Sequence, residues 1–288
     1  MANSIELFKS YIALLDEVYA QASKTAVLDG DASVAQAGKN ANEIVIPKMT
    51  MDGLADYSRN SGYKAGSASI TYETVKFNYD RGRKFTIDAM DDEETAGVAF
   101  GKLSSEFIRT KVVPEMDAFR FAKYASVEGI GKASGTLANG ADVVSAIRTA
   151  TNAMDEAEVP AEQRILFITP TLKGAIDDLD TTKSKEILSR FASVVEVPQS
   201  RFNTSVKLLT GESGELVGGF TATGSDINFM IVHAPAVIQY PKHTVNKVIT
   251  PEANQEADGW LFFYRAYGLA DAYENKAAGI YVHTKTGA

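Results

Sequence analysis

Residues 67–88, SASITYETVKFNYDRGRKFTID, decide the fold of this chain. Side chains alternate along this stretch, with Ile70 and Tyr72 on one side of the predicted strand and Thr71 on the other. Neither side is consistently apolar. With EIVIPKM at 43–49, the stretch predicts a long hairpin whose arms of about twenty residues would reach on the order of 60 Å. A two-stranded ribbon is marginally stable alone in water, so it needs another surface to lie on.

A run of charges ends the predicted hairpin at 79–95, YDRGRKFTIDAMDDEET. Carboxylates at a helix start are stabilised by the unpaired N–H groups there, whereas calcium loops space their ligands at alternate positions around a glycine. Consecutive helical residues point in different directions, so the sequence favours a helix start and a contact with another subunit over a metal site. The candidate contact residues in this run are Arg81, Arg83 and Lys84, followed by Asp88, Asp91, Asp92, Glu93 and Glu94.

Composition narrows the function further. The 288 residues are 45% hydrophobic and 23% charged, as in an ordinary folded protein, and the absence of cysteine excludes disulfides and thiolate sites. The net charge of −8 argues against wrapping nucleic acid through a basic surface. No apolar run approaches the ~18 residues of a membrane span, and the N-terminus lacks the pattern of a signal peptide. We expect no contact with a membrane.

Histidine supplies no candidate site. His233, His243 and His283 fall in different predicted β segments without ligand spacing among them. We therefore predict no catalytic residue, no metal and no cofactor, and a protein that is not an enzyme. A metal-dependent hydrolase built on the acidic cluster at 91–94 is the less favoured alternative.

Two helical segments flank the hairpin in the sequence. Near the N-terminus, apolar residues at helical spacing predict an amphipathic helix that packs on another surface, and a polar connector follows it. After the acidic cluster a long helix is predicted, with a kink or a break into two pieces at Pro114. Beyond residue 131, helices alternate with strands such as RILFITP at 164–170. The apolar face of the first helix consists of Phe8, Ile12, Leu15 and Tyr19.

Five stretches in a fixed order give the chain a resemblance to the tailed-bacteriophage major capsid proteins of the Hong Kong 97 fold. Residues 44–63 look like the outgoing arm of that family's extended loop, and 79–95 like its return arm. VVPEMDAFRFAKYAS at 112–126 looks like the end of the spine helix. Residues 164–176 and 227–283 are similar to parts of the axial domain and the peripheral domain. The resemblance covers almost the whole chain.

The resemblance implies an α+β fold with an N-terminal arm, an extended β-hairpin loop, a peripheral domain containing the spine helix, and an axial domain. It also implies inter-subunit contacts at the loop, where Tyr57, Tyr63 and Lys64 are candidates beside the charged run. The implied boundaries are 1–42 for the arm, 43–87 for the extended loop, 88–130 for the spine helix, 131–227 for the axial domain and 228–288 for the closing sheet of the peripheral domain.

The family's function sets the expected partners. Subunits form pentamers and hexamers that close into an icosahedral shell around double-stranded DNA, without sequence-specific contact. We expect portal and decoration proteins, and a separate scaffold or none, because Met1 lies almost directly before the arm. The protein would lie in the virion, and in the host cytoplasm during assembly.

Two further points concern chemistry and an alternative shell. Some family members crosslink a loop lysine to an asparagine of a neighbour, but no motif marks Lys64 or Asn275 with Glu274 for this reaction, and we expect no crosslink. A bacterial nanocompartment shell of the encapsulin type has the same fold and encloses an enzyme, so it is the alternative function.

Overall fold

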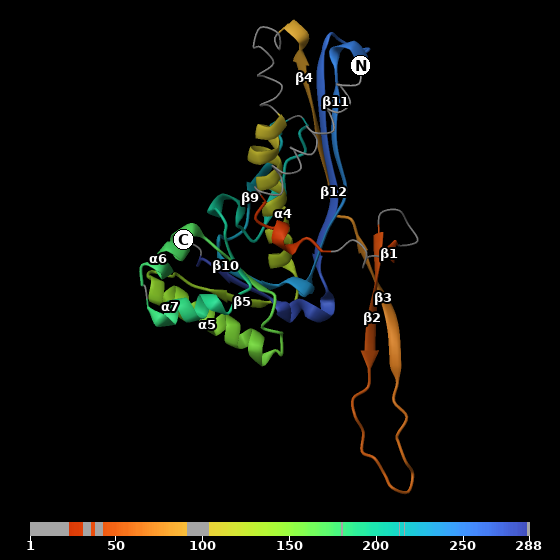
Figure 1. Cartoon of the computed structure of the whole chain (residues 1–288), viewed down its shortest axis with the longest axis vertical. Coiled ribbons are helices and arrows are strands. Elements are labelled where there is room, and N and C mark those ends of the chain that lie inside the picture. Colours follow the sequence, from red (N-terminus) through yellow and green to blue (C-terminus); the bar gives the residue numbers. More distant parts are fainter. Residues whose placement is uncertain are drawn as a thin grey trace.

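The computed structural model describes residues 23–30, 36–37, 43–90, 104–179, 181–212, 214–215 and 217–286. A five-stranded sheet with its helices lies to one side of the molecule in Figure 1, and a long three-stranded sheet rises from it beside a long helix. A hairpin projects away from both (Figure 1). The architecture is the α+β arrangement that the sequence predicts.

The five-stranded sheet has the strand order β5-β13-β10-β6-β7. β10 is antiparallel to both of its neighbours, whereas β6–β7 and β13–β5 are parallel pairs. Every residue of β6 is buried, as expected for an apolar strand covered on both faces. The strands are β5 (Gly131–Ser134), β6 (Arg164–Ile168), β7 (Ser193–Glu196), β10 (Ile227–His233) and β13 (Ile280–Thr284).

Helices cover both faces of this sheet. α5 (Gly140–Glu156), α6 (Pro170–Asp177) and α7 (Thr182–Ser189) lie on one face and share a core with Leu166 and Phe229. α4 (Val113–Ser126) lies on the other face, where Phe121 packs edge-on against Phe167. The alternation of helices and strands predicted beyond residue 131 is therefore confirmed.

The long sheet consists of β4 (Tyr79–Asp88), β11 (Val237–Ile249) and β12 (Gly259–Ala272), with β12 in the centre. α4 runs along one face of it (Figure 1), so this helix belongs to the cores of both sheets. Short elements complete the described chain: η1 (Ala26–Leu28), β1 (Gln36–Ala37), η4 (Gln199–Arg201), β8 (Val206–Leu208), β9 (Phe220–Ala222), η5 (Ala234–Ala236), η6 (Pro251–Ala253) and η7 (Glu274–Gly279).

The predicted long helix is interrupted next to Pro114, but it is not divided into two pieces, since its backbone stays helical through the interruption. Helical residues 104–107 pass into a wide π-helical turn, η3 (Ile108–Val112), and α4 follows with Pro114 in its first turn. Proline has no N–H to donate to the carbonyl of Thr110, and a π turn accommodates such an interruption of the α-helical ladder.

The hairpin is shorter than predicted. β2 (Glu43–Met51) pairs with β3 (Ala68–Lys76), but β4 pairs with β12 in the long sheet. The assignment of 79–95 to the return arm of the loop is therefore wrong for 79–88, which lie in the body of the molecule. The continuous alternation in 67–88 hid this change of partner at Phe77–Asn78, because a strand keeps the same period in either sheet.

Candidate assembly interface

One face of the projecting hairpin is apolar and exposed. In the β2–β3 register Met49 is opposite Ile70, and Met51 is opposite Ala68, so these side chains share a face, on which Tyr72 also lies. Met49, Met51, Ile70 and Tyr72 are each between 55% and 69% exposed. Over the whole ribbon neither face is consistently apolar, as predicted, since Thr74 and the opposed Glu43 and Lys76 lie on this same face. The methionines of the opposite arm make the outer half of the face apolar.

The other face of the hairpin is polar near its middle. Thr50 and Ser69 lie opposite each other, and their hydroxyl oxygens are 2.7 Å apart. The ribbon continues beyond the strands, since the Asp52 N–H donates to the carbonyl of Ser67, and the Ser67 N–H donates to the Asp52 carboxylate at 2.7 Å. The two arms are therefore held together for one further residue pair beyond the ladder.

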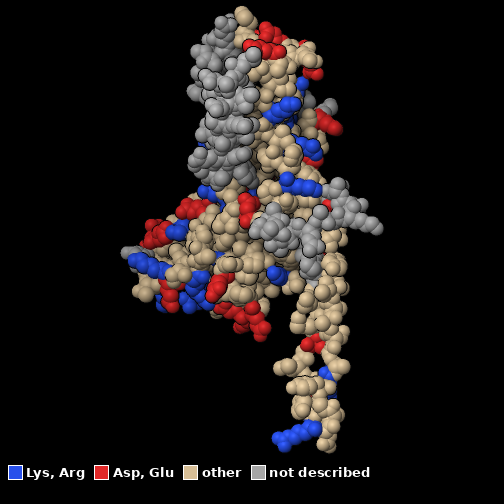
Figure 2. All heavy atoms as spheres, turned by 45° about the vertical axis from the view of Figure 1, so that its right-hand side comes forward, with Lys and Arg blue, Asp and Glu red and all other residues tan. Residues whose placement is uncertain are grey.

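The tip of the hairpin carries the predicted loop residues. Tyr57 and Tyr63 are exposed and lie edge-on, with ring centroids 4.9 Å apart. Lys64 is exposed beside them, and so is Leu54. Of the ten large apolar side chains that are exposed in the described part of the chain, seven lie on the hairpin. Figure 2 shows few charged side chains along the visible face of the hairpin.

The root of the hairpin is fixed to the long sheet. Ile44 and Val75 are buried against Ile238 and Leu269. Next to them, Phe77 stacks on Tyr267 with ring centroids 4.8 Å apart, and the ammonium group of Lys242 lies 4.5 Å from the Phe77 ring. The hairpin therefore leaves the body in a direction set by packing of the face that carries Ile44 and Val75. The exposed apolar side chains of Met49, Ile70 and Tyr72 lie on its opposite face.

Arg81 is paired within its own chain. Its Nε donates to the Glu115 carboxylate of α4 at 2.8 Å, and its Nη2 donates to the carbonyl of Gly219 at 3.3 Å. Both side chains of the ion pair are largely buried. The return of β4 into the body brings Arg81 to α4, and a contact between Arg81 and a carboxylate of a neighbouring subunit stays a prediction.

Tyr79 completes this cluster. Its hydroxyl donates to the same Glu115 oxygen at 3.2 Å, and its ring packs against Phe119. Burial, together with the neighbouring Glu115 carboxylate, raises the pKa of Tyr79 well above its ordinary value. The sequence reasoning did not find Glu115 or Gly219, since no local pattern connects β4 to either of them.

The other cations of the charged run also lie along the body. Nη1 of Arg83 would be 3.2 Å from a Cβ placed on Gly211 or Gly218, so the loop between β8 and β9 approaches this guanidinium closely. Nζ of Lys84 lies 3.5 Å from the Glu256 carboxylate in an exposed pair. Whether Arg83 or Lys84 also contacts another subunit stays a prediction.

The acidic residues are described only in part. Asp88 accepts a hydrogen bond from the N–H of Met90 at 3.0 Å, as expected of a carboxylate at a helix start. Asp91, Asp92, Glu93 and Glu94 lie outside the described residues, as do Phe8, Ile12, Leu15 and Tyr19 of the N-terminal helix. Their predicted roles remain predictions.

A cleft of about 910 Å³ lies between β4, the start of the long helix and the β8–β9 loop. Aromatic rings of Phe85 and Phe107, which are 4.7 Å apart, form part of its wall, and Arg81 and Lys111 supply charge. The described lining of the cleft offers aromatic packing surface and cations.

No group of three or more His, Asp or Glu side chains within the described ranges is placed to hold a metal ion. His283 is buried, with Nδ1 3.0 Å from the amide nitrogen of Asn228, and burial lowers its pKa. Burial also lowers the pKa of His233. Among the described helices none is both long and apolar enough to cross a membrane.

Solved structures with the same architecture are viral capsids and a virus-like particle. The capsid structure of the cyanophage P-SCSP1u matches 88% of this chain and 86% of its own, with a TM-score of 0.56 and 12% identity. The mature capsid of bacteriophage PhiM1 covers 88% and 84%, with a TM-score of 0.55 and 11% identity. The virus-like particle from Pyrococcus furiosus covers 96% and 99%, with a TM-score of 0.59 and 10% identity.

No protein-family model matches the sequence, and no curated protein matches it. At 10–12% identity the likeness lies in the fold, and it extends over most of both chains in every one of these comparisons. The element order and the projecting hairpin agree with it. The chain thus has the Hong Kong 97-type fold of the tailed-phage major capsid proteins.

Proposed function

We propose that this protein is a major capsid protein that assembles through its hairpin into the pentamers and hexamers of an icosahedral shell around double-stranded DNA. The observation that carries the proposal is the apolar hairpin face of Met49, Met51, Ile70 and Tyr72, which is exposed on a single subunit. Contiguous exposed apolar surface of this kind is typical of protein–protein contacts. A second copy supplies the missing cover.

Repetition makes the contact effective. A shell uses the same hairpin contact in every subunit, and contacts that form together reinforce one another beyond their individual strength. The fixed root at Ile44 and Val75 supports this role, because a hairpin that is held in one direction loses less conformational freedom on docking. Residues 43–76 serve as the extended loop, and the remaining implied domain boundaries are part of the proposal.

The other parts of the proposed function follow from the shell. The protein acts structurally and not as an enzyme, and it lies in the virion after assembly in the host cytoplasm. Portal, scaffold and decoration proteins are its proposed partners. DNA is enclosed without sequence-specific contact, in keeping with the net charge of −8.

A nanocompartment shell is the second candidate function. The virus-like particle from Pyrococcus furiosus covers 96% of this chain, more than the two phage capsids described above. This candidate predicts a similar shell that encloses protein in place of DNA.

Electron microscopy and sedimentation of the purified full-length chain test the proposal. We expect closed particles or capsomers, and nuclease-resistant DNA in particles assembled together with the other head proteins. Particles filled with a cargo protein would favour the nanocompartment. A stable monomer at high concentration, with no particles in any assembly condition, would contradict both functions.

A further inference from the structure

Methionine is the only sulfur-containing residue type in this chain, which has seven methionines and no cysteine. No thiolate therefore competes with the thioether groups for an oxidant. Among the described residues, three methionines are exposed: Met49 at 57%, Met51 at 69% and Met90 at 63%. An oxidant in solution therefore has direct access to these three side chains.

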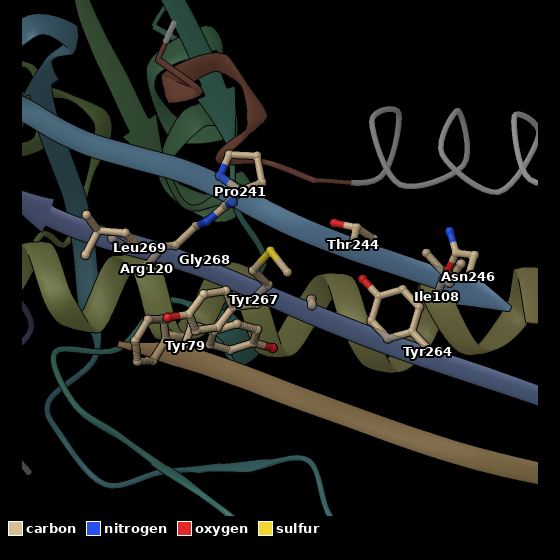
Figure 3. A pocket seen from close by; sticks show the side chains of 14 residues that line it. Tyr79, Ile108, Arg120, Pro241, Thr244, Asn246, Tyr264, Tyr267, Gly268 and Leu269 are labelled. Carbon is tan, nitrogen blue, oxygen red and sulfur yellow. The ribbon is translucent and has the colours of Figure 1, made fainter. Parts of the chain in front are cut away.

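The other methionines that the structure describes are protected by the body of the molecule. Met154 of α5 and Met230 of β10 lie in the two large apolar cores and are 2% and 0% exposed. Met116 lines a pocket of about 260 Å³ between α4 and the long sheet (Figure 3), and it is 8% exposed. The chain thus contains exposed and buried thioethers whose oxidation can be compared in one experiment.

Two of the exposed methionines lie on the hairpin. Met49 and Met51 are two residues apart on β2, so their side chains share a face, where they are opposite Ile70 and Ala68 of β3. This is the apolar outer half of the face that forms the proposed assembly contact. Met90 lies outside the hairpin, shortly after β4, and has a similar exposure. It therefore serves as a control within the same chain.

Oxidation changes the polarity of a methionine side chain. Hydrogen peroxide transfers one oxygen atom to the thioether sulfur: an S–O bond forms as the O–O bond breaks, the sulfur loses two electrons, and the peroxide is reduced to water. The sulfoxide is polar and accepts hydrogen bonds. On a free subunit it stays hydrated, but in an apolar contact it loses water without gaining a donor, which is unfavourable. Oxidation at Met49 and Met51 should therefore weaken the contact and leave the stability of the subunit unchanged.

We propose that Met49 and Met51 form a reversible oxidation site that controls assembly. Peroxide oxidation of the two thioethers blocks the hairpin contact. Reduction by methionine sulfoxide reductases restores it, with the oxygen leaving as water and a dithiol reductant becoming a disulfide. This control requires the assembly through the hairpin that is proposed above. An assembled shell protects both sulfur atoms, because the contact covers them, whereas free subunits remain sensitive.

Hydrogen peroxide applied to the full-length chain tests this site. Free subunits are oxidised in conditions that do not support assembly, and peptide mass spectrometry gives the sulfoxide fraction at each methionine. We expect Met49, Met51 and Met90 to be oxidised at least roughly tenfold faster than Met154 and Met230, because oxidation follows exposure. After removal of the peroxide, sedimentation compares the particle yield of oxidised and untreated subunits, and both should have the same midpoint of urea unfolding.

Two variants separate the hairpin methionines from the others, and each is compared with its own untreated sample. Met90→Leu should lose assembly on oxidation by at least roughly tenfold, as the natural chain does, because both hairpin sulfur atoms remain and the weakened contact is repeated in every subunit. Met49→Leu with Met51→Leu should stay at its own untreated level, since leucine has a similar apolar volume and no thioether. Treating the oxidised natural chain with reductases for both sulfoxide epimers and a dithiol should restore assembly.

The possible results distinguish this site from the proposed function itself. Unimpaired assembly of natural subunits that carry sulfoxide at Met49 and Met51 would overturn the oxidation site and leave the shell function in place. Equal losses on oxidation in the natural chain and in Met49→Leu with Met51→Leu would overturn it too, as would a failure to recover once both thioethers are regenerated. Absence of particles from untreated natural subunits would overturn the proposed function, and the oxidation site with it.

Discussion

In β6 and β10 every residue from Arg164 to Ile168 and from Ile227 to Val232 is buried, whereas in β3 only Val75 is buried among nine residues. Both regions contain isoleucine and aromatic side chains. In the five-stranded sheet these apolar side chains are covered by α4, α5, α6 and α7. No described helix lies over the hairpin. The difference indicates which apolar surfaces stabilise the subunit and which are left for another copy.

The largest loss of stability is expected in the five-stranded sheet. Phe229→Ala removes a fully buried ring that stacks on His283 with centroids 5.0 Å apart. We expect the free energy of unfolding to fall by about 3–5 kcal/mol, because a cavity is left in a packed core. Urea unfolding of the unassembled subunit measures this effect. A loss as small as that of a surface variant would contradict the conclusion that the five-stranded sheet stabilises the subunit more than the hairpin does.

An intermediate loss is expected where β4 meets the long helix. Arg81→Met leaves the buried Glu115 carboxylate without its ion pair, and we expect about 1–3 kcal/mol of destabilisation. Arg265→Met is the matched control, since Arg265 holds Asp80 in an exposed pair at 2.7 Å on the adjacent strand. Such exposed pairs contribute about 0.2–1 kcal/mol. Equal losses in the two variants would contradict the assignment of Arg81 to the body.

The same cluster predicts a response to alkaline pH. The folded-state pKa of Tyr79 lies above its unfolded value near 10, so its contribution to stability is complete below about pH 10 and falls as pH rises toward the folded-state pKa. The expected slope is about 1.4 kcal/mol per pH unit for one proton. Unfolding measured from pH 9 upward should show this term in the natural chain and lack it in Tyr79→Phe.

The smallest effect on the subunit is expected in the hairpin. Ile70→Ser with Tyr72→Ser should change the free energy of unfolding by no more than about 0.5 kcal/mol, because both side chains are exposed. Assembly measured by sedimentation should nevertheless be lost. Thr50→Ala with Ser69→Ala, on the opposite face of the same ribbon, is the matched control and should assemble normally. Unimpaired particles from the first variant would remove the apolar face from the interface.

The sequence predicts which segments form helices and strands better than it predicts which strands and side chains contact each other. The buried strand at Arg164–Ile168 and the interruption at Pro114 follow from local rules, since unbroken apolar runs and a missing N–H act where they occur. The change of sheet between β3 and β4 does not follow from a local rule, because side chains alternate in the same way in both strands. Predicting the apolar hairpin face requires the register between the two arms, which neither arm contains by itself. Predicting the Arg81–Glu115 pair requires knowing that residues 34 positions apart meet.

The π turn at Ile108–Val112 determines which way two rings point. Phe107 and Phe119 are twelve residues apart, which at about 100° per residue would leave them roughly 120° apart around an unbroken α-helix. Both nevertheless face the long sheet, with Phe107 4.7 Å from Phe85 and Phe119 5.0 Å from Tyr79. A turn closed by i→i+5 bonds rotates less per residue and absorbs the difference. The π turn thus accommodates one extra residue without rotating Phe107 away from the side of the helix on which Phe119 lies. Deleting a single residue there would leave a plain α-helix with both rings still on the sheet.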